Sequence, residues 1–466
     1  MNLPRIMLAA AASGSGKTLI TCGLLKLLKN RGFNLTAFKC GPDYIDPMFH
    51  SRVLGLKSRN LDSFFTEPDV LRSLMAKNSH GADLAVLEGV MGFYDGLSGF
   101  CEKSSAYDIA CITDTPVIFI VNCKGMSLSV IPYIKGFLEY KENSHIKGVI
   151  LNELSPMLYK KMKEKIEGEL PVKVCGYVPR VDFTLESRHL GLVMPDEIAG
   201  LSQQLEALSA VLEESLEVDE IIDIAQEAEG LKAKEEVLRK FVSWSGFESV
   251  RKQPLKIGLA KDEAFCFFYE DNLQLLREMG AQLLPFSPVH DPHLPEGING
   301  LLLYGGYPEL LANELSKNES MKREIKAAIE GRMPLMAECG GFMYLHESMQ
   351  GADGNYHPMA GVIEGTVHKR NKLTRFGYIT LSEGKAFGKE TGSLPSHEFH
   401  YYDSENCGDA FLARKPLSER SWRCLHSTDT MLAGYPHLYY YSNRELAGAF
   451  MEAALKYRSE HFAEGK

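Results

Sequence analysis

The sequence lacks any apolar run long enough to cross a bilayer, so we expect no membrane-spanning segment. None of its ten cysteines forms a C-x-x-C pair, which argues against a zinc site and against a disulfide framework. This cysteine usage fits a reducing, cytoplasmic compartment. An excess of positive charge is also missing. The net charge is -10 and the pI is about 5.8, so no nucleic-acid partner is expected.

What the chain does have is length and an ordinary globular composition. Its 466 residues are too many for one hydrophobic core, so two or three domains are expected. Hydrophobic residues make up 45% of the chain, which is typical of a globular protein. The apolar residues 6–12 are too few for a signal peptide, and they run directly into a Gly-Ser-Gly-Lys segment. We therefore predict no targeting sequence there.

Residues 1–212 alternate short apolar runs with helical patterns, which predicts a doubly wound parallel α/β domain. The strands expected there are Arg5–Ala10, Leu35–Lys39, Leu84–Leu87, Val117–Val121, Gly148–Leu151 and Val172–Tyr177. Residues 213–254 are acidic and helical in pattern, and we interpret them as a linker. A second doubly wound parallel α/β domain is expected over 255–458. Its expected strands are Lys256–Ala260, Gln282–Pro285, Gly300–Tyr304 and Pro334–Ala337.

A phosphate-binding motif follows the first expected strand. Residues 11–18 end in G-x-G-K-T and open a helix, as in a P-loop, although Ala11 stands where a glycine is usual. The residues expected to bind ATP are Gly14, Ser15, Gly16, Lys17 and Thr18. In such a loop backbone amides cradle the phosphates, the lysine reaches the outer ones, and the threonine hydroxyl meets Mg²⁺. The competing interpretation is a glycine-rich turn with a surface lysine.

Polar residues also follow three other expected strands of the first domain. Glu88 ends an apolar strand, as expected of a second Mg²⁺ anchor. Asp43 and Asp46 lie on a proline-flanked loop at the carboxyl end of a strand, where open α/β sheets bind ligands. They are also common turn formers. Asn152 ends a later strand and can recognise adenine or form a turn.

In the second domain, an apolar run at 334–337 ends abruptly at Glu338 and Cys339, followed by Gly340 and Gly341. This layout is typical of a nucleophile elbow, a strained strand-to-helix turn that glycines allow to fold tightly. We expect the helix that follows to continue through Leu345. Its N-terminus would favour the thiolate form of the cysteine. The competing interpretation is a buried structural cysteine.

Other residues can complete a thiol active site. The loop after one strand can aim the N–H of Gly306 at a developing oxyanion, with the N–H of Gly340 as a second donor. Candidate bases are His346, His397, His400 and His437. His346 would lie two helical turns, roughly 10 Å, beyond Cys339, too far for a direct hydrogen bond. His437 precedes a C-terminal helix, on a loop that can reach the elbow. His397 and His400 are either residues of a ligand-binding loop or half-buried core histidines.

Five features occur in one order along the chain. They are the P-loop, G-P-D-Y-I-D-P at 41–47, G-G-Y-P-E at 305–309, E-C-G-G-F-M-Y at 338–344, and the late His437. Together they resemble the cobyrinic acid a,c-diamide synthase family, over most of the chain apart from the acidic segment. The resemblance implies a dethiobiotin synthetase-like P-loop domain followed by a class I glutamine amidotransferase-like domain.

The resemblance also implies a two-site reaction in cobalamin biosynthesis. Cys339 would attack L-glutamine and release ammonia, His437 would shuttle protons, and Gly306 and Gly340 would stabilise the oxyanion. At the other site ATP and Mg²⁺ would phosphorylate a corrinoid carboxylate, and ammonia would displace phosphate at side chains a and c. By matching positions, the residues expected at that site are Lys17, Thr18, Asp43, Asp46 and Glu88, with Thr18, Asp43 and Glu88 at the metal, and Tyr44 and Ile45 at the substrate.

One position departs from ordinary triad amidotransferases, which carry a glutamate two residues after the histidine. Tyr439 stands there, which leaves open what orients His437. The same chemistry on hydrogenobyrinic acid or on nickel sirohydrochlorin is an alternative. A P-loop regulatory ATPase with an inactive amidotransferase-like binding domain is another, and a ligase that uses free ammonia is a third. A homodimer is compatible with the sequence.

Overall fold

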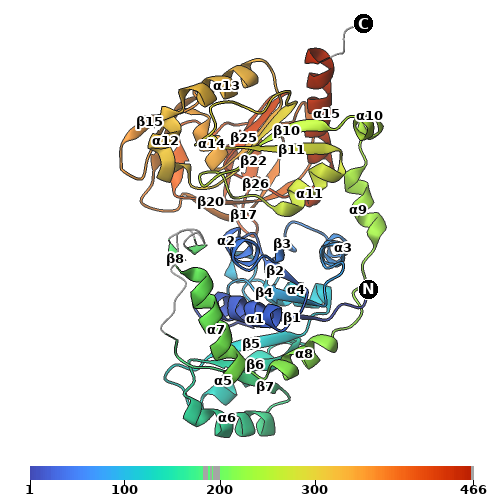
Figure 1. Ribbon diagram of the computed structural model, residues 1–466, viewed down its shortest axis with the longest axis vertical. Coiled ribbons are helices and arrows are strands. Elements are labelled where there is room, and N and C mark those ends of the chain that lie inside the picture. Colours follow the sequence, from blue (N-terminus) through green and yellow to red (C-terminus); the bar gives the residue numbers. More distant parts are fainter. Residues whose placement is uncertain (182–186, 189–190, 193–199, 463–466) are drawn as a thin grey trace. The chain divides into compact units, whose positions relative to one another are not determined.

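The computed structural model describes residues 1–181, 187–188, 191–192 and 200–462 (Figure 1). The chain forms two compact units, Met1–Leu238 and Arg239–Lys466. The acidic segment 213–254, predicted as a linker, is divided between them. Helix α8 (Val218–Gln226) belongs to the first unit, and α10 (Phe247–Lys252) belongs to the second. Within the described ranges no helix has the length and apolar character needed to cross a membrane.

The first unit is built on a seven-stranded sheet in the order β3-β2-β4-β1-β5-β6-β7, with every neighbouring pair parallel. Its strands are β1 (Arg5–Ala10), β2 (Leu35–Cys40), β3 (Lys57–Leu61), β4 (Leu84–Glu88), β5 (Val117–Asn122), β6 (Ile146–Asn152) and β7 (Lys173–Val178). The predicted parallel sheet is therefore confirmed for this unit. β3, with the polar sequence KSRNL, was not predicted.

Helices cover both faces of this sheet, as a doubly wound fold requires. On one face α3 (Pro68–Asn78), α4 (Ala106–Thr113), α5 (Val130–Glu139) and α6 (Pro156–Glu169) share one hydrophobic core with the strands. The other face carries α1 (Lys17–Asn30), α7 (Leu201–Ser215) and α8, and Figure 1 shows α1 and α7 side by side. A Cβ on Gly23 would lie 2.5 Å from Leu212, so glycine permits this close approach.

The first unit also contains a fully buried arginine, Arg5, at the start of β1. Its guanidinium donates to the carbonyls of Leu3, Thr113, Asp114 and Glu229, at distances between 2.7 and 3.1 Å, and thereby joins three segments. A lysine cannot reproduce this planar fork, so several buried carbonyls would lose their donors.

We predict that Arg5→Lys lowers the free energy of unfolding by about 2 to 4 kcal/mol, measured by urea denaturation. The matched control is Arg31→Lys, because Arg31 forms a surface ion pair with Glu213 at 2.6 Å. Exposed ion pairs contribute about 0 to 1 kcal/mol. Equal losses in the two variants would contradict the structural role assigned to Arg5.

The second unit is built on a six-stranded sheet in the order β11-β10-β12-β13-β25-β24, parallel except for β24. Its strands are β10 (Leu255–Ala260), β11 (Ala281–Phe286), β12 (Gly300–Leu303), β13 (Leu335–Glu338), β25 (Met431–Gly434) and β24 (His426–Ser427). The helices of this unit include α11 (Glu270–Glu278), α13 (Glu319–Glu330) and α15 (Arg444–His461). The predicted parallel core is confirmed here too.

Besides the two-stranded sheet β18-β19 (Lys385–Ala386 and Lys389–Glu390), the described residues of the second unit form two larger sheets that were not predicted, and both are largely antiparallel. One has the order β23-β22-β17-β20-β26, with β17 (Arg375–Ser382), β20 (Leu394–His400), β22 (Phe411–Arg414), β23 (Ser421–Cys424) and β26 (His437–Leu438). The other has the order β15-β14-β16-β21, with β14 (His346–Gln350), β15 (Tyr356–Pro358), β16 (Ile363–Lys369) and β21 (Tyr402–Ser404). The second unit is therefore more than a doubly wound sheet. His437, expected on a loop, lies on β26 because that segment pairs with β20.

Candidate active site

The predicted P-loop connects β1 to α1. Gly14 and Gly16 have φ of 78° and 90°, a left-handed conformation that glycine adopts without strain. The side-chain amide of Asn152 donates to the carbonyl of Ser15 at 3.0 Å. A Cβ on Gly16 would lie 2.6 Å from that amide nitrogen. Asn152, predicted to contact adenine, therefore supports the backbone of the P-loop in this structure.

Lys17 and Thr18 begin α1, just beyond the carboxyl end of the central strand β1. The ammonium of Lys17 donates to the carbonyls of Ala12 at 2.9 Å and Met91 at 2.6 Å. Burial and the positive charge of Lys39 lower the pKa of Lys17 to about 8. The hydroxyl of Thr18 donates to Oε1 of Glu88 at 2.6 Å, so these two predicted residues meet.

A buried charged cluster extends from Glu88, and it includes two residues that sequence reasoning missed. The ammonium of Lys39, on β2, lies 2.7 Å from Oδ2 of Asp46 and 2.9 Å from Oε1 of Glu88. The Nε2 atom of His50 lies 3.4 Å from Oε2 of Glu88. Parallel strands β2 and β4 are neighbours, so their carboxyl ends bring Lys39 and Glu88 together. A charged residue at the end of an apolar strand is the signal that could have identified Lys39.

The charged groups of this cluster shift one another's pKa values. Burial alone would raise the pKa of Glu88, but the charge of Lys39, the nearby His50 and the hydrogen bond from Thr18 hold it well below its usual range. Burial lowers the pKa of Lys39, and the charges of Asp46 and Glu88 outweigh it and raise that pKa. Burial and the charge of Glu88 raise the pKa of Asp46. The result is a charged ammonium fixed between two carboxyl groups.

Hydrogen bonds hold the loop that carries the other predicted residues. Oδ1 of Asp43 accepts from the backbone N–H of Ile45 at 2.9 Å, an Asx turn. The amide of Asn60, on β3, donates to the carbonyls of Gly41 and Asp43 at 2.9 and 2.7 Å. Ile45 is buried and opens the short helix α2 (Ile45–Met48) directly after Tyr44. The turn-forming role of Asp43 is thus observed, and its role toward metal or substrate stays a prediction.

The residues around Thr18 are chemically suited to Mg²⁺. Glu88 is fully buried, and its Oε2 atom has no hydrogen-bond partner in the described ranges. Those ranges contain no group of three or more His, Cys, Asp or Glu side chains that could hold a metal unaided. Protein sites for Mg²⁺ commonly supply one or two oxygen ligands and leave the others to water and nucleotide phosphates. The pair of hydroxyl and carboxylate fits that pattern.

In the second unit, Cys339 lies on a strained turn between β13 and α14 (Gly340–Tyr344). Its φ of 46° and ψ of -106° are unfavourable for any residue with a Cβ, as expected of a nucleophile elbow. A Cβ on Gly341 would lie 1.9 Å from the carbonyl oxygen of Leu303, so this glycine is required. A Cβ on Gly340 would lie 3.1 Å from the amide nitrogen of Gly306. The predicted elbow and both predicted oxyanion donors therefore lie together.

His437 lies beside the same cysteine. A Cβ on Gly305 would lie 2.8 Å from Cε1 of His437 and 3.5 Å from Cβ of Cys339, so these residues surround one point. Nδ1 of the imidazole lies 3.6 Å from Oε2 of Glu338, a carboxylate that sequence reasoning missed. Burial alone would lower the pKa of His437, but its interactions with Cys339 and Glu338 raise it to about 10. A thiol, an imidazole and two backbone amides are thus arranged as nucleophilic attack on a carbonyl carbon requires.

Two of the other candidate histidines, His346 and His400, have separate partners, and His397 pairs with His437 between β20 and β26. Helix α14 ends at Tyr344, so His346 opens β14 instead of continuing the helix as predicted. Its Nδ1 donates to the carbonyl of Phe342 at 3.0 Å, and its Nε2 accepts from the hydroxyl of Ser404 at 2.6 Å. His400 is buried and stacks on Tyr435 with ring centroids 3.8 Å apart. These contacts assign both histidines to the core of the unit.

β20 also places a buried carboxylate, Glu398, in this unit. Neither of its oxygens has a hydrogen-bond partner in the part of the chain that the structure describes, and Nε2 of His400 lies 4.0 Å away. Burial raises the pKa of Glu398 from 4.5 to about 7, against the charge of Arg375. Between pH 4.5 and about pH 7, Glu398 is protonated in the folded state and ionised in the unfolded state. The free energy of unfolding therefore falls as the pH rises through this range.

We predict that Glu398→Gln removes this pH dependence, because glutamine does not ionise. Relative to the unchanged protein, the variant should gain on the order of 3 kcal/mol of stability between about pH 4.5 and about pH 7. Urea denaturation at pH values on either side of this window measures the gain. A constant difference between the two proteins across the window would contradict the raised pKa.

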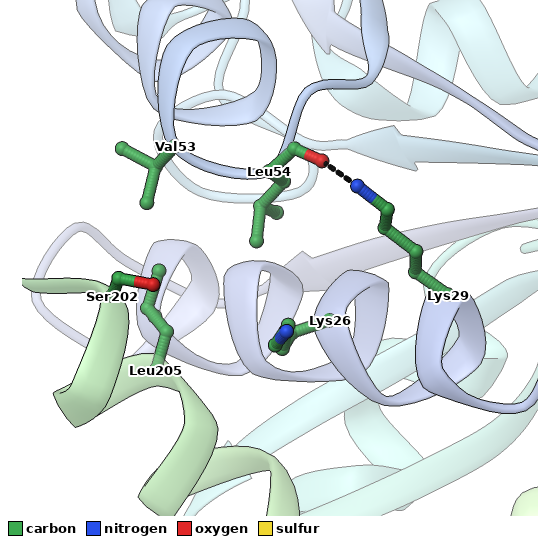
Figure 2. Close-up of a pocket in the computed structure, with 6 residues that line it drawn as sticks. All are labelled: Lys26, Lys29, Val53, Leu54, Ser202 and Leu205. Atoms are coloured by element: carbon green, nitrogen blue, oxygen red, sulfur yellow. Dashed lines mark hydrogen bonds between the residues drawn. The ribbon is translucent and has the colours of Figure 1, made fainter.

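A small surface pocket lies elsewhere on the first unit, and no predicted site residue lines it. Figure 2 shows its lining residues: Lys26, Lys29, Val53, Leu54, Ser202 and Leu205. Both lysines already have partners, since Lys29 donates to the carbonyl of Leu54 at 2.6 Å and Lys26 pairs with Glu206 at 2.7 Å. We assign this pocket no part in the chemistry.

Comparison with known proteins follows the same division of the chain. Residues 6–192 match the family described as CobQ/CobB/MinD/ParA nucleotide binding domain, and residues 256–445 match the CobB/CobQ-like glutamine amidotransferase domain. Three similar curated proteins carry the name cobyrinate a,c-diamide synthase. Those from Caldanaerobacter subterraneus subsp. tengcongensis, Listeria innocua serovar 6a and Priestia megaterium are 38%, 37% and 34% identical. The alignments cover 96%, 94% and 97% of this chain and 97% of each relative.

Proposed function

The chain belongs to the cobyrinate a,c-diamide synthase family, and we propose that it uses ATP and L-glutamine to convert the a and c carboxylates of cobyrinic acid to amides. One observation carries this proposal. A P-loop with a buried carboxylate cluster and a cysteine elbow with its histidine occur in the same chain. The P-loop with its cluster suits phosphoryl transfer to a carboxylate. The cysteine elbow with its histidine suits release of ammonia from an amide.

At the elbow, the proton of the Cys339 thiol passes to His437, and the thiolate attacks the side-chain amide carbon of glutamine. The N–H groups of Gly306 and Gly340 stabilise the oxyanion. The C–N bond then breaks as the nitrogen takes the proton from His437 and leaves as ammonia. Water, deprotonated by His437, hydrolyses the glutamyl thioester to glutamate and restores the thiol.

At the P-loop, a carboxylate oxygen of the corrinoid attacks the outer phosphorus of ATP, and ADP leaves. The ammoniums of Lys17 and Lys39 offset the negative charge that develops there. Ammonia then attacks the acyl carbon of the acyl phosphate, and the amide forms as inorganic phosphate leaves. Activation is needed because a free carboxylate is a poor electrophile with a poor leaving group. Tyr44 and Ile45, at the start of α2, are proposed to contact the corrinoid.

Thr18 and Glu88, with Asp43 as the predicted third ligand, would hold Mg²⁺, which when bound neutralises the charge of the outer phosphates. The ammonium of Lys39, placed between Asp46 and Glu88, offsets part of the repulsion between those two carboxyl groups. A cytoplasmic location and a homodimer remain predictions.

Incubation with ATP, Mg²⁺ and L-glutamine against each candidate acid tests the proposal. We expect cobyrinic acid to gain two amides, detected by mass spectrometry. Amidation of hydrogenobyrinic acid or nickel sirohydrochlorin instead would assign the same chemistry to another tetrapyrrole. If none of the three acids changed mass, the proposed function would be wrong.

A further inference from the structure

The residue at the position of the missing triad acid has another partner. The hydroxyl of Tyr439 donates to Oδ2 of Asp271, on α11, at 2.9 Å. The neighbouring Asn272 donates to the carbonyl of Leu438 at 2.7 Å and accepts from the N–H of Tyr440 at 2.8 Å. These bonds fix the chain after His437 against α11. They do not supply the carboxylate that an active-site imidazole needs.

Glu338 supplies a carboxylate next to the imidazole. It is the last residue of β13, immediately before Cys339, and its side chain is buried. Its Oε2 lies 3.6 Å from Nδ1 of His437, and Oε1 has no hydrogen-bond partner within the described residues. A buried carboxylate is costly unless a charge or donor compensates it. The imidazole is the cationic partner that lies next to this one.

Glu398 is the competing carboxylate, since its charge also acts on His437. The register of β20 and β26 pairs His397 directly with His437, so these two side chains share one face of the sheet. Glu398, next to His397 on β20, points to the opposite face. Its closest basic group is His400, at 4.0 Å. The geometry thus favours Glu338.

We propose that Glu338 is the positioning residue that orients His437, in place of the acid absent at Tyr439. The inference rests on the proposed glutaminase function of the elbow. With Nδ1–H directed at the carboxylate, Nε2 is left to take the thiol proton and later to give it to the departing nitrogen. Burial raises the pKa of Glu338 and its interaction with His437 lowers it, and as a carboxylate it stabilises the imidazolium. The nucleophile and its orienting acid are thereby adjacent in the chain, and no residue after His437 is required.

The test compares Glu338→Gln, Glu338→Asp and Glu398→Gln in the full-length protein, with glutamate release as the readout. Glu338→Gln should lower kcat on the order of 10³-fold with little change in KM, because the wrong tautomer of His437 is then favoured. Glu338→Asp keeps the charge and should recover part of this loss. Glu398→Gln should retain kcat. The rate of Cys339 alkylation by iodoacetamide should fall in Glu338→Gln, since the imidazolium no longer stabilises the thiolate.

Three results would overturn the inference: an unchanged kcat in Glu338→Gln, equal losses in the glutamine and aspartate variants, or a loss confined to Glu398→Gln. Each leaves the proposed function intact, provided that the unchanged protein releases glutamate. If the unchanged protein releases none, the glutaminase function itself is wrong. An unchanged KM for glutamine would indicate a misoriented histidine, whereas a raised KM would indicate a distorted binding site.

Discussion

Cys339→Ala is expected to abolish glutamine-dependent amidation and to leave ammonia-dependent amidation intact. The thiol forms the covalent bond to glutamine, and no other group at the elbow can replace it. Loss of a catalytic nucleophile lowers kcat by at least about 10³-fold. The P-loop belongs to the other unit, so its chemistry does not depend on this side chain. Product formation with glutamine and with ammonium salt, measured on the same sample, gives the result.

The matched control is Cys424→Ala. Cys424 is also buried in the second unit, on β23, away from the elbow in sequence, and should be dispensable for both reactions. If Cys339→Ala retained the glutamine reaction, the cysteine would be a core thiol and the elbow would have no catalytic role. If the unchanged protein amidated nothing with either nitrogen source, the regulatory ATPase interpretation would be favoured.

Lys17→Ala is expected to have the opposite pattern, with loss of amidation from both nitrogen sources. The ammonium lies at the start of α1, where phosphates bind, and its removal leaves developing phosphoryl charge uncompensated. Loss of one such group lowers the rate by about 10²- to 10³-fold. Hydrolysis of glutamine at the elbow does not use ATP chemically, so it should remain measurable in the variant.

Lys26→Ala is the matched control on the same helix, because its ammonium pairs with Glu206 at the surface pocket (Figure 2). It should leave both rates unchanged. Phosphate release with corrinoid acid and ammonium distinguishes the two variants. Wild-type phosphate release from Lys17→Ala would contradict a phosphate-binding role for this loop.

The sequence was sufficient for the parallel cores because their strands are apolar and end in recognisable turns. It failed where strands are polar, as in β3 with its sequence KSRNL. Strand prediction also failed where the paired strands are far apart in the sequence. β20, for example, pairs Ser396 with Leu438 of β26. The helix expected after the elbow is shorter than predicted, because His346 pairs with β16 instead.

In the two candidate sites, too, the features set by local sequence could be predicted and those set by the fold could not. The meeting of Thr18 with Glu88, and the strained turn at Cys339 and Gly340, could be predicted because they follow from strand ends and short motifs. The meeting of Lys39 with Asp46 depends on a strand end and a loop coming together, and no local pattern encodes that distance. Glu338 stood beside the nucleophile in the sequence, yet its relation to His437 arises only when β26 pairs with β20 and reaches the elbow.

The central claim is that glutamine nitrogen reaches two corrinoid carboxylates through ATP-dependent activation. Glutamine labelled isotopically at its amide nitrogen, with cobyrinic acid and ATP, tests it in one reaction. We predict a product with two labelled nitrogens and one phosphate released for each. An unlabelled product, or labelled product formed without phosphate release, would contradict the account.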